Sequence, residues 1–331
     1  GAHAAGAMTS GPGPAAPPSP ALAAGPCGRA AGLPVVVVGV HRAGLDGADR
    51  TAAGLVDLVV TDPEPVLSTV SAAPRAAVTL ALVLRATLEL GVPAGLAAES
   101  AAYSMLQSGP EFAAWLAARG RGGTPSVGPS PLDSPSGLAG PRVAGAVAGG
   151  DRVVTLERGG AELRITLNRP DRHNAVNVAL QEQLVEALLV AAADPSVERV
   201  VLDGAGPSFC SGGDLAEFGT RPDPVTAHLV RLTRSPARLL AELAPGLEVR
   251  LHGACIGAGI EMAAFAGRVV ARPDTEISLP EVGLGLIPGA GGTVSLPRRI
   301  GRHRTAELAL LGRSVDADTA LGWGLIDTIE R

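Results

Sequence analysis

The chain has 331 residues and a formal net charge of −5, and 46% of its residues are apolar. This length permits one large domain or two modest ones with a sizeable core, and the acidic balance disfavours a nucleic-acid-binding surface. The sequence contains no lysine, so every basic side chain is arginine. That composition excludes lysine Schiff-base chemistry and a lysine-bearing phosphate loop.

The cysteines and the apolar runs bear on the cellular compartment. Cys27, Cys210 and Cys255 are too few and too scattered for a disulfide framework or a zinc cluster. The longest apolar run, residues 76–84, is far too short to span a bilayer, and residues 1–33 lack the basic-then-apolar order of a signal peptide. We therefore expect a cytoplasmic protein without a metal site, a membrane partner or a nucleic-acid partner.

Composition divides the chain into four regions. Residues 1–33 are rich in Pro, Ala and Gly, which predicts a disordered tail. Residues 34–120 are predicted to combine strands with helices, and residues 121–150, rich in Gly, Pro and Ser, are predicted to form a flexible linker spanning about 30 Å. Residues 151–331 form the remaining region, which we expect to be the core.

The region before the linker is predicted to be largely helical. PVVVVGV at 34–40 indicates a buried strand, and GLVDLVV at 54–60 indicates a second one. Helical periodicity follows over residues 72–90, 94–107 and 110–118. No side chain in these helices stands out as placed for chemistry, so we expect them to serve packing.

After the linker, strands and helices alternate. The expected strands are residues 152–157, 162–167, 199–203, 248–252 and 268–271, and the expected helices are residues 178–193 and 226–243, the second bent or broken at Pro236. A hairpin through Gly159 and Gly160 joins the first two strands. This alternation predicts an α/β fold with right-handed crossovers.

Three segments carry chemical signals. SFCSGGDL at 208–215 follows a strand and exposes backbone N–H groups at a glycine turn. LHGACIGAGIEMAAFAG at 251–267 places a small-residue turn before a helix with Glu261 in its first turn, where N–H groups and the positive dipole end favour an anion. SLPEVGLGLIPGAGGT at 278–293 carries Glu281. Together they suit acyl-thioester chemistry, which needs two donors at the thioester oxygen and a pair of groups that move protons.

Several motifs in the same order resemble the enoyl-CoA hydratase/isomerase family, the crotonase superfamily. The resemblance runs almost continuously over residues 152–331 through ITLNRPDRHNAVN, FCSGGDL, HGACIGAGIEMA, LPEVGLGLIPGAGGT and LGWGLIDTIE. It implies a crotonase-like ββα-repeat spiral fold, an acyl-CoA thioester as substrate, a homotrimer or hexamer, and no cofactor beyond the coenzyme A of the substrate. The family often has Gly where this chain has Ala258, whose methyl group is expected to narrow the acyl pocket.

Carried over by position, the resemblance implies particular roles. The oxyanion-hole donors fall on the backbone N–H groups of Ser211 and Ala258, and the two hydratase glutamates fall on Glu261 and Glu281. Residues expected to line the substrate and CoA channel are Arg172, Asn174, Ala175, Ser211, Gly212, Gly213, Asp214, Gly257, Ala258, Pro288 and Gly289.

Several of these residues also have structural interpretations. Glu261 near a helix N-terminus could simply favour the dipole, and Asp214 is better explained as a turn-capping residue than as an acid catalyst. Cys210 and Cys255 are expected to be small buried apolar side chains.

A departure from the family pattern predicts an altered chain order. Family members continue for several dozen residues after the GLID-like strand, whereas this sequence stops at Arg331, and residues 54–120 are similar to that missing end. Residues 45–60 also echo residues 315–330 at a constant offset, with Asp57 matching Asp327. We therefore expect a circularly permuted crotonase with its helical trimerisation-type segment placed N-terminally; the alternative is an unrelated helical N-terminal domain.

The predicted activity is hydration of a trans-2-enoyl-CoA. Glu261 would position and deprotonate water, and Glu281 would act as its acid/base partner. Two alternatives stay open: another crotonase reaction, such as isomerisation, dehydration, decarboxylation or thioester hydrolysis, and a non-catalytic crotonase-like scaffold subunit.

Overall fold

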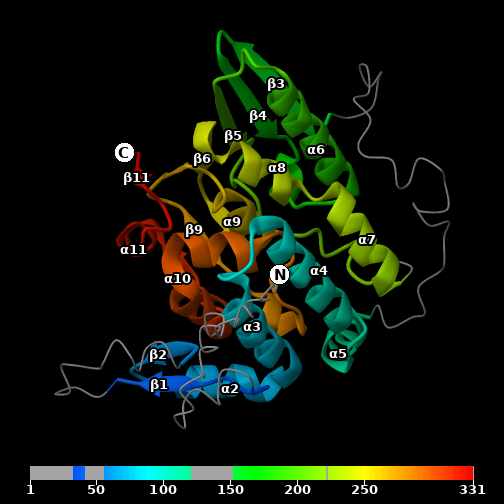
Figure 1. Ribbon diagram of the computed structural model, residues 1–331, viewed down its shortest axis with the longest axis vertical. Coiled ribbons are helices and arrows are strands. Elements are labelled where there is room, and N and C mark those ends of the chain that lie inside the picture. Colours follow the sequence, from blue (N-terminus) through cyan, green and yellow to red (C-terminus); the bar gives the residue numbers. More distant parts are fainter. Residues whose placement is uncertain (1–32, 42–55, 121–151, 221–222, 331) are drawn as a thin grey trace, which may run out of the picture.

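The computed structural model describes residues 33–41, 56–120, 152–220 and 223–330. The predicted linker at 121–150, Cys27 and all but one residue of the predicted tail lie outside the described residues. The described part is a mixed α/β structure in which helices from both halves of the chain surround a six-stranded sheet and a three-stranded one (Figure 1).

The six-stranded sheet has the strand order β11-β8-β6-β5-β4-β3. Its strands are β3 (Val154–Gly159), β4 (Glu162–Leu167), β5 (Arg199–Gly204), β6 (Leu247–Leu251), β8 (Arg268–Ala271) and β11 (Thr328–Ile329). β3 and β4 pair antiparallel and end at the Gly159–Glu162 pair, which confirms the predicted hairpin, and the remaining neighbours pair parallel.

The helix between β4 and β5 covers one face of this sheet. α6 (Val178–Ala193) begins where the Asn177 side chain accepts a hydrogen bond of 2.9 Å from the amide of Leu180. Leu180, Leu184 and Leu188 recur at helical spacing, are fully buried and lie on the side of α6 that packs on β3 and β4.

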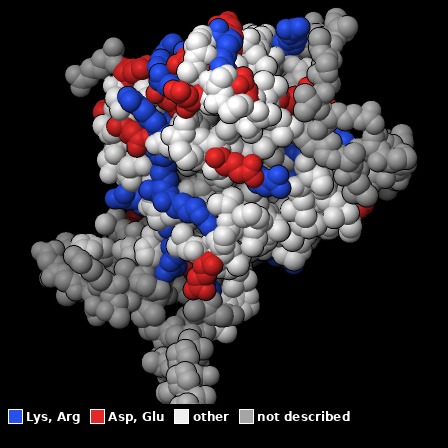
Figure 2. All heavy atoms as spheres, turned by 45° about the horizontal axis from the view of Figure 1, so that its top comes forward, with Lys and Arg blue, Asp and Glu red and all other residues white. Residues whose placement is uncertain are grey.

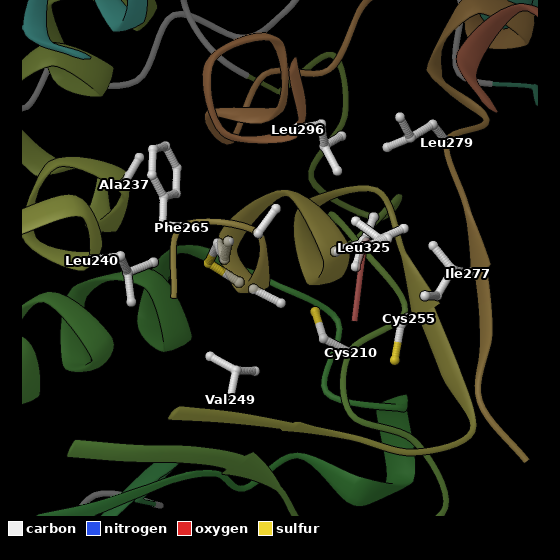
Figure 3. Close-up of a cluster of buried hydrophobic side chains, with 14 of the residues drawn as sticks. Cys210, Ala237, Leu240, Val249, Cys255, Phe265, Ile277, Leu279, Leu296 and Leu325 are labelled. Carbon is white, nitrogen blue, oxygen red and sulfur yellow. The ribbon is translucent and has the colours of Figure 1, made fainter. Parts of the chain in front are cut away.

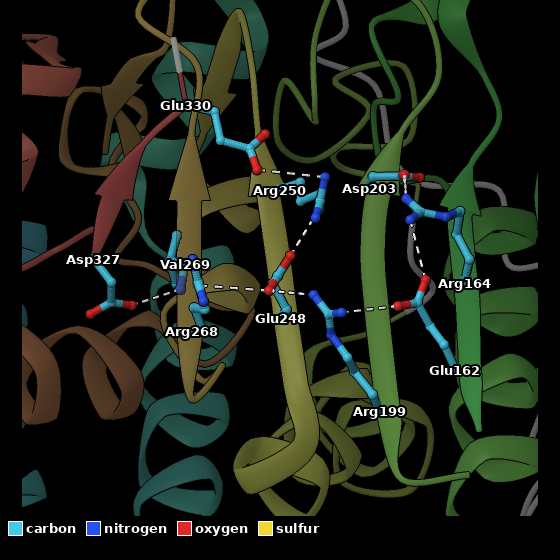
Figure 4. A network of polar contacts seen from close by, with 10 residues as sticks. All are labelled: Glu162, Arg164, Arg199, Asp203, Glu248, Arg250, Arg268, Val269, Asp327 and Glu330. Atoms are coloured by element: carbon cyan, nitrogen blue, oxygen red, sulfur yellow. Dashed lines mark hydrogen bonds and ion pairs between the residues drawn. The ribbon is translucent and has the colours of Figure 1, made fainter. Parts of the chain in front are cut away.

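The other face of the sheet carries a ladder of ion pairs. Glu248 on β6 lies 2.7 Å from Arg199 on β5, 2.8 Å from Arg250 and 3.6 Å from Arg268 on β8. Figure 4 shows these side chains reaching across adjacent strands, and Figure 2 shows arginine and acidic side chains interspersed on the face that it presents. Three guanidinium groups surround one buried carboxylate, so these ion pairs link β6 to its neighbours β5 and β8.

A second layer contains the small sheet β10-β9-β7 and the helices around it. Its elements are β7 (Ala254–Ile256), α9 (Ala258–Ala263), β9 (Glu276–Ser278), η4 (Glu281–Leu284), α10 (Gly292–Leu311), β10 (Val315–Asp316) and α11 (Ala317–Trp323). Apolar side chains from both sheets, from α8 (Pro236–Leu243) and from α10 converge around α9 (Figure 3). Cys210 and Cys255 lie in this cluster fully buried, which confirms the prediction that they act as small apolar side chains.

Two helices precede β6 in place of one. The predicted helix over 226–243 is broken at Pro236 into α7 (Pro224–Arg234) and α8 (Pro236–Leu243), as expected from the missing proline N–H. The side chain of Ser235, between them, accepts a hydrogen bond from the amide of Ala237 and so begins α8.

The N-terminal segment, residues 33–41 and 56–120, packs against this core. It consists of the parallel pair β1 (Val38–Val40) and β2 (Leu58–Val60) and the helices α2 (Glu64–Ala72), α3 (Pro74–Thr87), α4 (Val92–Gln107) and α5 (Pro110–Ala118). α3 packs on α10, α4 packs on α7, α8 and α10, and α5 contacts η4. In Figure 1, α3 and α4 lie in front of the core helices.

Two predictions for this segment need correction. The helix expected over 72–90 is α3, which begins only at Pro74, because Ala73 precedes a proline and is forced out of the helical region, at φ −137° and ψ 64°; the separate helix α2 before it was not predicted. PVVVVGV is half-buried to exposed rather than buried, because among the described residues its strand β1 pairs with β2 alone, outside the main sheet. In the part of the chain that the structure describes, no single helix is long and apolar enough to cross a bilayer; α2 and α3 would pass that test only together, across a 110° bend.

The aspartates Asp57 and Asp327 occupy equivalent local arrangements. Asp57 accepts a hydrogen bond of 2.8 Å from the amide of Val37, and its own amide donates to the Val37 carbonyl over 2.8 Å. Asp327 accepts one of 2.7 Å from the amide of Val269, and its amide donates to the Val269 carbonyl over 2.8 Å. Each carboxylate also bonds an arginine, Arg85 and Arg299 respectively. The echo noticed in the sequence therefore has a structural counterpart.

Candidate active site

A cavity of about 180 Å³ lies where the three chemical segments meet α4, α6 and α7. Its walls are formed by Tyr103, Gln107, Val176, Asn177, Gln181, Gly213, Asp214, Glu217, Phe218, Ala227, Val230, Arg231, Ala258, Glu261, Glu281, Gly289 and Ala290. Both predicted glutamates and both loops with candidate amide donors thus open onto one space.

Glu261 is held at the start of two helices. It lies in the short helix α9, is 2% exposed, and its Oε2 accepts hydrogen bonds from the amides of Ala290 at 2.7 Å and Gly292 at 2.9 Å, just before and at the start of α10. Gly292 must lack a side chain, since a Cβ there would lie 2.6 Å from Cγ of Glu261. Burial raises the pKa of Glu261 well above its usual range, the charges of Glu281 and Glu99 raise it further, and the two amide donors oppose the rise.

Glu281 begins η4 directly after Pro280 and faces the same cavity. Its Oε2 is shielded from solvent and accepts no hydrogen bond from the described residues. Gly257 gives the carboxyl group room, because a Cβ at that position would collide with Oε1 of Glu281. Burial raises the pKa of Glu281 to about 7, and the charge of Glu99 acts in the same direction.

Two backbone amides on the cavity wall have no acceptor among the described residues. Ala258 is the first residue of α9, so its N–H has no partner within the helix. Gly213 also lines the cavity, and no hydrogen bond from its N–H to a described residue is formed, although the amide of its neighbour Asp214 donates to the Val176 carbonyl at 2.9 Å. Two unbonded donors on one wall are the arrangement that an oxyanion requires.

The predicted donor Ser211 needs correction. Its amide donates to the carbonyl of His173 over 2.9 Å, and the residue does not line the cavity. Gly213, two residues further on, does line the cavity, and its amide donates to no described residue, so the structure favours Gly213 as the partner of Ala258.

The channel residues predicted around HNAV lie outside the cavity. Arg172 is exposed and lies beside Asp171, and Ala175 does not line the cavity, so their contact with CoA stays a prediction. Asn174 is fully buried at φ 53°; its Oδ1 accepts from the Arg169 amide, and its Nδ2 donates to two carbonyl groups. Its side chain is fully used in bonds to its own loop and to the loop after β5, and it does not line the cavity.

The remaining channel predictions divide in two. Gly213, Asp214, Ala258 and Gly289 line the cavity, whereas Gly212, Gly257 and Pro288 do not. Asp214 also caps its own turn, because its Oδ1 accepts from the amide of Ala216 at 3.0 Å. Gly257 begins α9 at φ 49°, a left-handed value that favours glycine.

The wall of the cavity that α4 and α7 supply was not predicted from the sequence. Tyr103 and Gln107 on α4 and Arg231 on α7 line the cavity, and the Arg231 guanidinium lies 4.8 Å from the centre of the Tyr103 ring. Glu99 lies one turn before Tyr103, buried beside the same site. These three α4 residues recur at four-residue spacing, a polar stripe in an otherwise small and apolar helix, and that spacing was the available signal.

The family model for enoyl-CoA hydratase/isomerase matches residues 157–330, which is more than half of the chain. The chain belongs to the enoyl-CoA hydratase/isomerase family. This membership agrees with the mixed α/β fold and with the cavity between the three predicted segments.

Named family members of similar identity include hydratases and an isomerase. The chain is 38% identical over 167 residues to 2,3-dehydroadipyl-CoA hydratase of Escherichia coli, covering 50% of this chain and 65% of that protein. It is 37% identical over 168 residues to 1,2-epoxyphenylacetyl-CoA isomerase of the same organism, covering 50% and 64%, and 36% identical over 176 residues to mevalonyl-coenzyme A hydratase of Beauveria bassiana, covering 50% and 62%. The chain therefore spans less than two thirds of the length of these curated relatives.

Solved structures show the same partial coverage. An enoyl-CoA hydratase from Bacillus anthracis matches with a TM-score of 0.51 and 30% identity over 54% of this chain and 70% of that one. An enoyl-CoA hydratase of Mycobacterium smegmatis gives the same four values.

Proposed function

We propose that this family member is an enoyl-CoA hydratase that adds water across the double bond of a trans-2-enoyl-CoA. The observation that carries the proposal is that two carboxyl groups and two unbonded amides line one cavity. The thioester oxygen would accept hydrogen bonds from the amides of Gly213 and Ala258. These bonds stabilise the negative charge that develops on that oxygen as the enolate forms.

The two glutamates would divide the proton transfers. Burial raises the pKa of both glutamates. The two amide donors to Glu261 oppose that rise and favour it as the ionised member of the pair, whereas the Oε2 of Glu281 receives no donor from a described residue. Glu261 would take a proton from water as the hydroxyl oxygen bonds to Cβ, and Glu281 would give its proton to Cα. The sum is one water added, with the proton on Glu261 available to restore Glu281. This chemistry uses the coenzyme A of the substrate and no further cofactor.

An isomerase is the second candidate, because the isomerase relative is as similar to this chain as the hydratases are. Incubation with short, medium, branched and aromatic enoyl-CoAs separates the two. A hydratase removes the absorbance of the conjugated enoyl thioester and forms a 3-hydroxyacyl-CoA, whereas an isomerase forms no hydroxyl product.

Variants at the two acids test the mechanism. Glu261→Gln or Glu281→Gln should each lower kcat by about a hundredfold or more while CoA-ester binding persists. Unchanged turnover in both variants would refute the assignment, and CoA-ester binding without any turnover in the wild type would favour a non-catalytic subunit.

We also propose that the chain order is circularly permuted relative to its relatives. Three observations support this order: the comparisons leave about a third of each relative unmatched, α3–α5 pack on the matched core, and Asp57 repeats the arrangement of Asp327. Cleavage at a protease site introduced within 121–150 tests it. The two fragments should co-elute and retain activity, and a fragment of residues 151–331 that is fully active alone would contradict the proposal.

We also propose an oligomeric state and a cellular compartment, the first of them from the family resemblance. A homotrimer or hexamer is expected in light scattering, and a monomer at working concentration would refute that expectation. The free, buried thiols of Cys210 and Cys255 are consistent with the reducing cytoplasm that we propose as the compartment.

A further inference from the structure

Four consecutive amides at the start of α10 are shared in alternation by two buried carboxylates. Glu261 accepts from Ala290 and Gly292, as described above. Glu99 accepts from the other two amides. Its Oε1 bonds the amide of Gly291 at 2.7 Å, and its Oε2 bonds the amide of Thr293 at 2.8 Å. Two acids from opposite halves of the chain thus occupy one helix N-terminus.

The carboxylate of Glu99 is buried and accepts three hydrogen bonds. Its residue is 2% exposed, and the hydroxyl of Thr293 donates a third hydrogen bond of 2.7 Å to its Oε2. The N-terminus of a helix stabilises negative charge through its free N–H groups and its dipole. Glu99 bonds the amides of Gly291 and Thr293, so only the amides of Ala290 and Gly292 remain for Glu261. These two donors fix where the Glu261 carboxylate lies.

We propose that Glu99 is a positioning residue for the reaction: it fixes the start of α10, and through it the position of the Glu261 carboxylate. The proposal rests on the proposed function, since Glu261 is taken there as the group that accepts the proton of water. It assigns an active-site role to α4, a helix that lies outside the region matched by the family model.

The charged groups around Glu99 come from four elements. Arg231 on α7 favours its ionised form, while Glu261 on α9, Glu281 on η4 and Tyr103 on α4 lie in the same buried cluster. Burial raises the pKa of Glu99 to about 7, against the three hydrogen bonds and Arg231. The charge of Glu99 in turn raises the pKa of both Glu261 and Glu281.

The sign of the expected effect follows from this repulsion. Glu99→Gln keeps the size of the side chain and removes its negative charge, so the ionised form of Glu261 becomes easier to reach. The acid limb of the pH–rate profile should move to lower pH by about one unit. A purely structural role would lower the rate by the same factor at every pH.

Glu111→Gln is the matched control. Glu111, on α5 of the same segment, also bonds two amides at a helix start, those of Arg75 at 2.9 Å and Ala76 at 3.0 Å on α3, but Glu261 bonds no amide at that helix start. This variant should leave the pH–rate profile where it is in the wild type. A shift of the same size in Glu111→Gln would overturn the proposal.

A second measurement does not depend on turnover. Denaturant unfolding of the wild type, Glu99→Gln, Glu261→Gln and the double variant forms a double-mutant cycle. At alkaline pH, where both carboxyl groups are ionised, their charges repel, so the cycle should show a coupling of about tenfold in the unfolding equilibrium constant, and at pH 5 the coupling should shrink. Additive effects at both pH values, or a uniform rate loss without a shift of the acid limb, would overturn the role of Glu99. Loss of the proposed function would instead appear as a wild type without hydratase activity but with the coupling intact.

Discussion

The ring of Tyr103 lies directly against the backbone of Gly289, where a Cβ atom would come within 2.6 Å of Cε2. Tyr103 belongs to α4 and Gly289 to the loop that leads into α10, so this contact joins the two halves of the chain at the wall of the cavity. The loop can pass under the ring only because residue 289 has no side chain.

Gly289→Ala should therefore weaken the docking of α4. We expect a loss of about 1–3 kcal/mol in the free energy of unfolding, typical of overpacking, and a lower kcat, measured by urea titration and by the enoyl-thioester assay. Gly283→Ala is the matched control, because a Cβ at Gly283 meets nothing within 4 Å. Combining Gly289→Ala with Tyr103→Ala should recover part of the lost stability, and no recovery would contradict the proposed cause.

Ala258→Pro should remove one oxyanion donor with little effect on the fold. Ala258 is the first residue of α9, where proline fits because the N–H there lacks a partner within the helix. We expect kcat to fall about a hundred- to a thousandfold with an unchanged unfolding midpoint. Ala258→Gly, which keeps the N–H, should retain activity; an active proline variant would exclude the amide of residue 258 as a donor.

The buried acids make stability depend on pH. The pKa values of Glu99 and Glu281 rise from 4.5 to about 7 on folding, so between these values the folded protein holds more protons than the unfolded chain. The free energy of unfolding should therefore decrease as pH rises from 5 to 8, by about 3 kcal/mol for a single carboxyl group shifted this far. Denaturant titrations at a series of pH values should show this slope, and Glu99→Gln should flatten it; a stability that rises over this range would disprove the arrangement.

Asp57 and Asp327 should differ in how much each contributes to the free energy of unfolding. The Asp57 side chain is 3% exposed and bonds Arg85, itself 13% exposed, at 2.6 Å, whereas the Asp327 side chain is 44% exposed. Asp57→Ala leaves a buried guanidinium without that partner and should cost about 3 kcal/mol or more, while Asp327→Ala should cost about 1 kcal/mol. Thermal unfolding of both variants checks the order, and equal losses would contradict it.

Local signals predicted the elements that local chemistry controls. The helix α6 and the strands β4 and β8 have the predicted bounds. Asn177 caps α6 and its leucines recur at helical spacing, apolar residues alternate along β4, and β8 is a short apolar run. The break at Pro236 was likewise visible in the sequence. The separate helix α2, which ends just before Ala73, was not predicted, although Pro74 marks the boundary between α2 and α3 in the same way.

The sequence predicted only those residues of the site that belong to recognisable motifs. Glu261 and Glu281 lie where their motifs placed them, on one cavity. The amide that faces this cavity could not be chosen from the sequence, because the bond between Ser211 and His173 is a tertiary contact that decides it. Glu99 was missed for a related reason: its partners Gly291 and Thr293 lie 192 and 194 residues along the chain.

The packing of α3 on α10 has a consequence for how a ribosome makes this protein. The apolar face of α3, including Ala77, Leu80 and Leu84, leaves the exit tunnel roughly 200 residues before α10, the surface that covers it. At about 5–20 residues per second this delay is roughly 10–40 seconds. During that interval the apolar face of α3 is exposed to solvent on the nascent chain. Chaperones that bind emerging polypeptides should therefore associate with α3 until α10 has been synthesised.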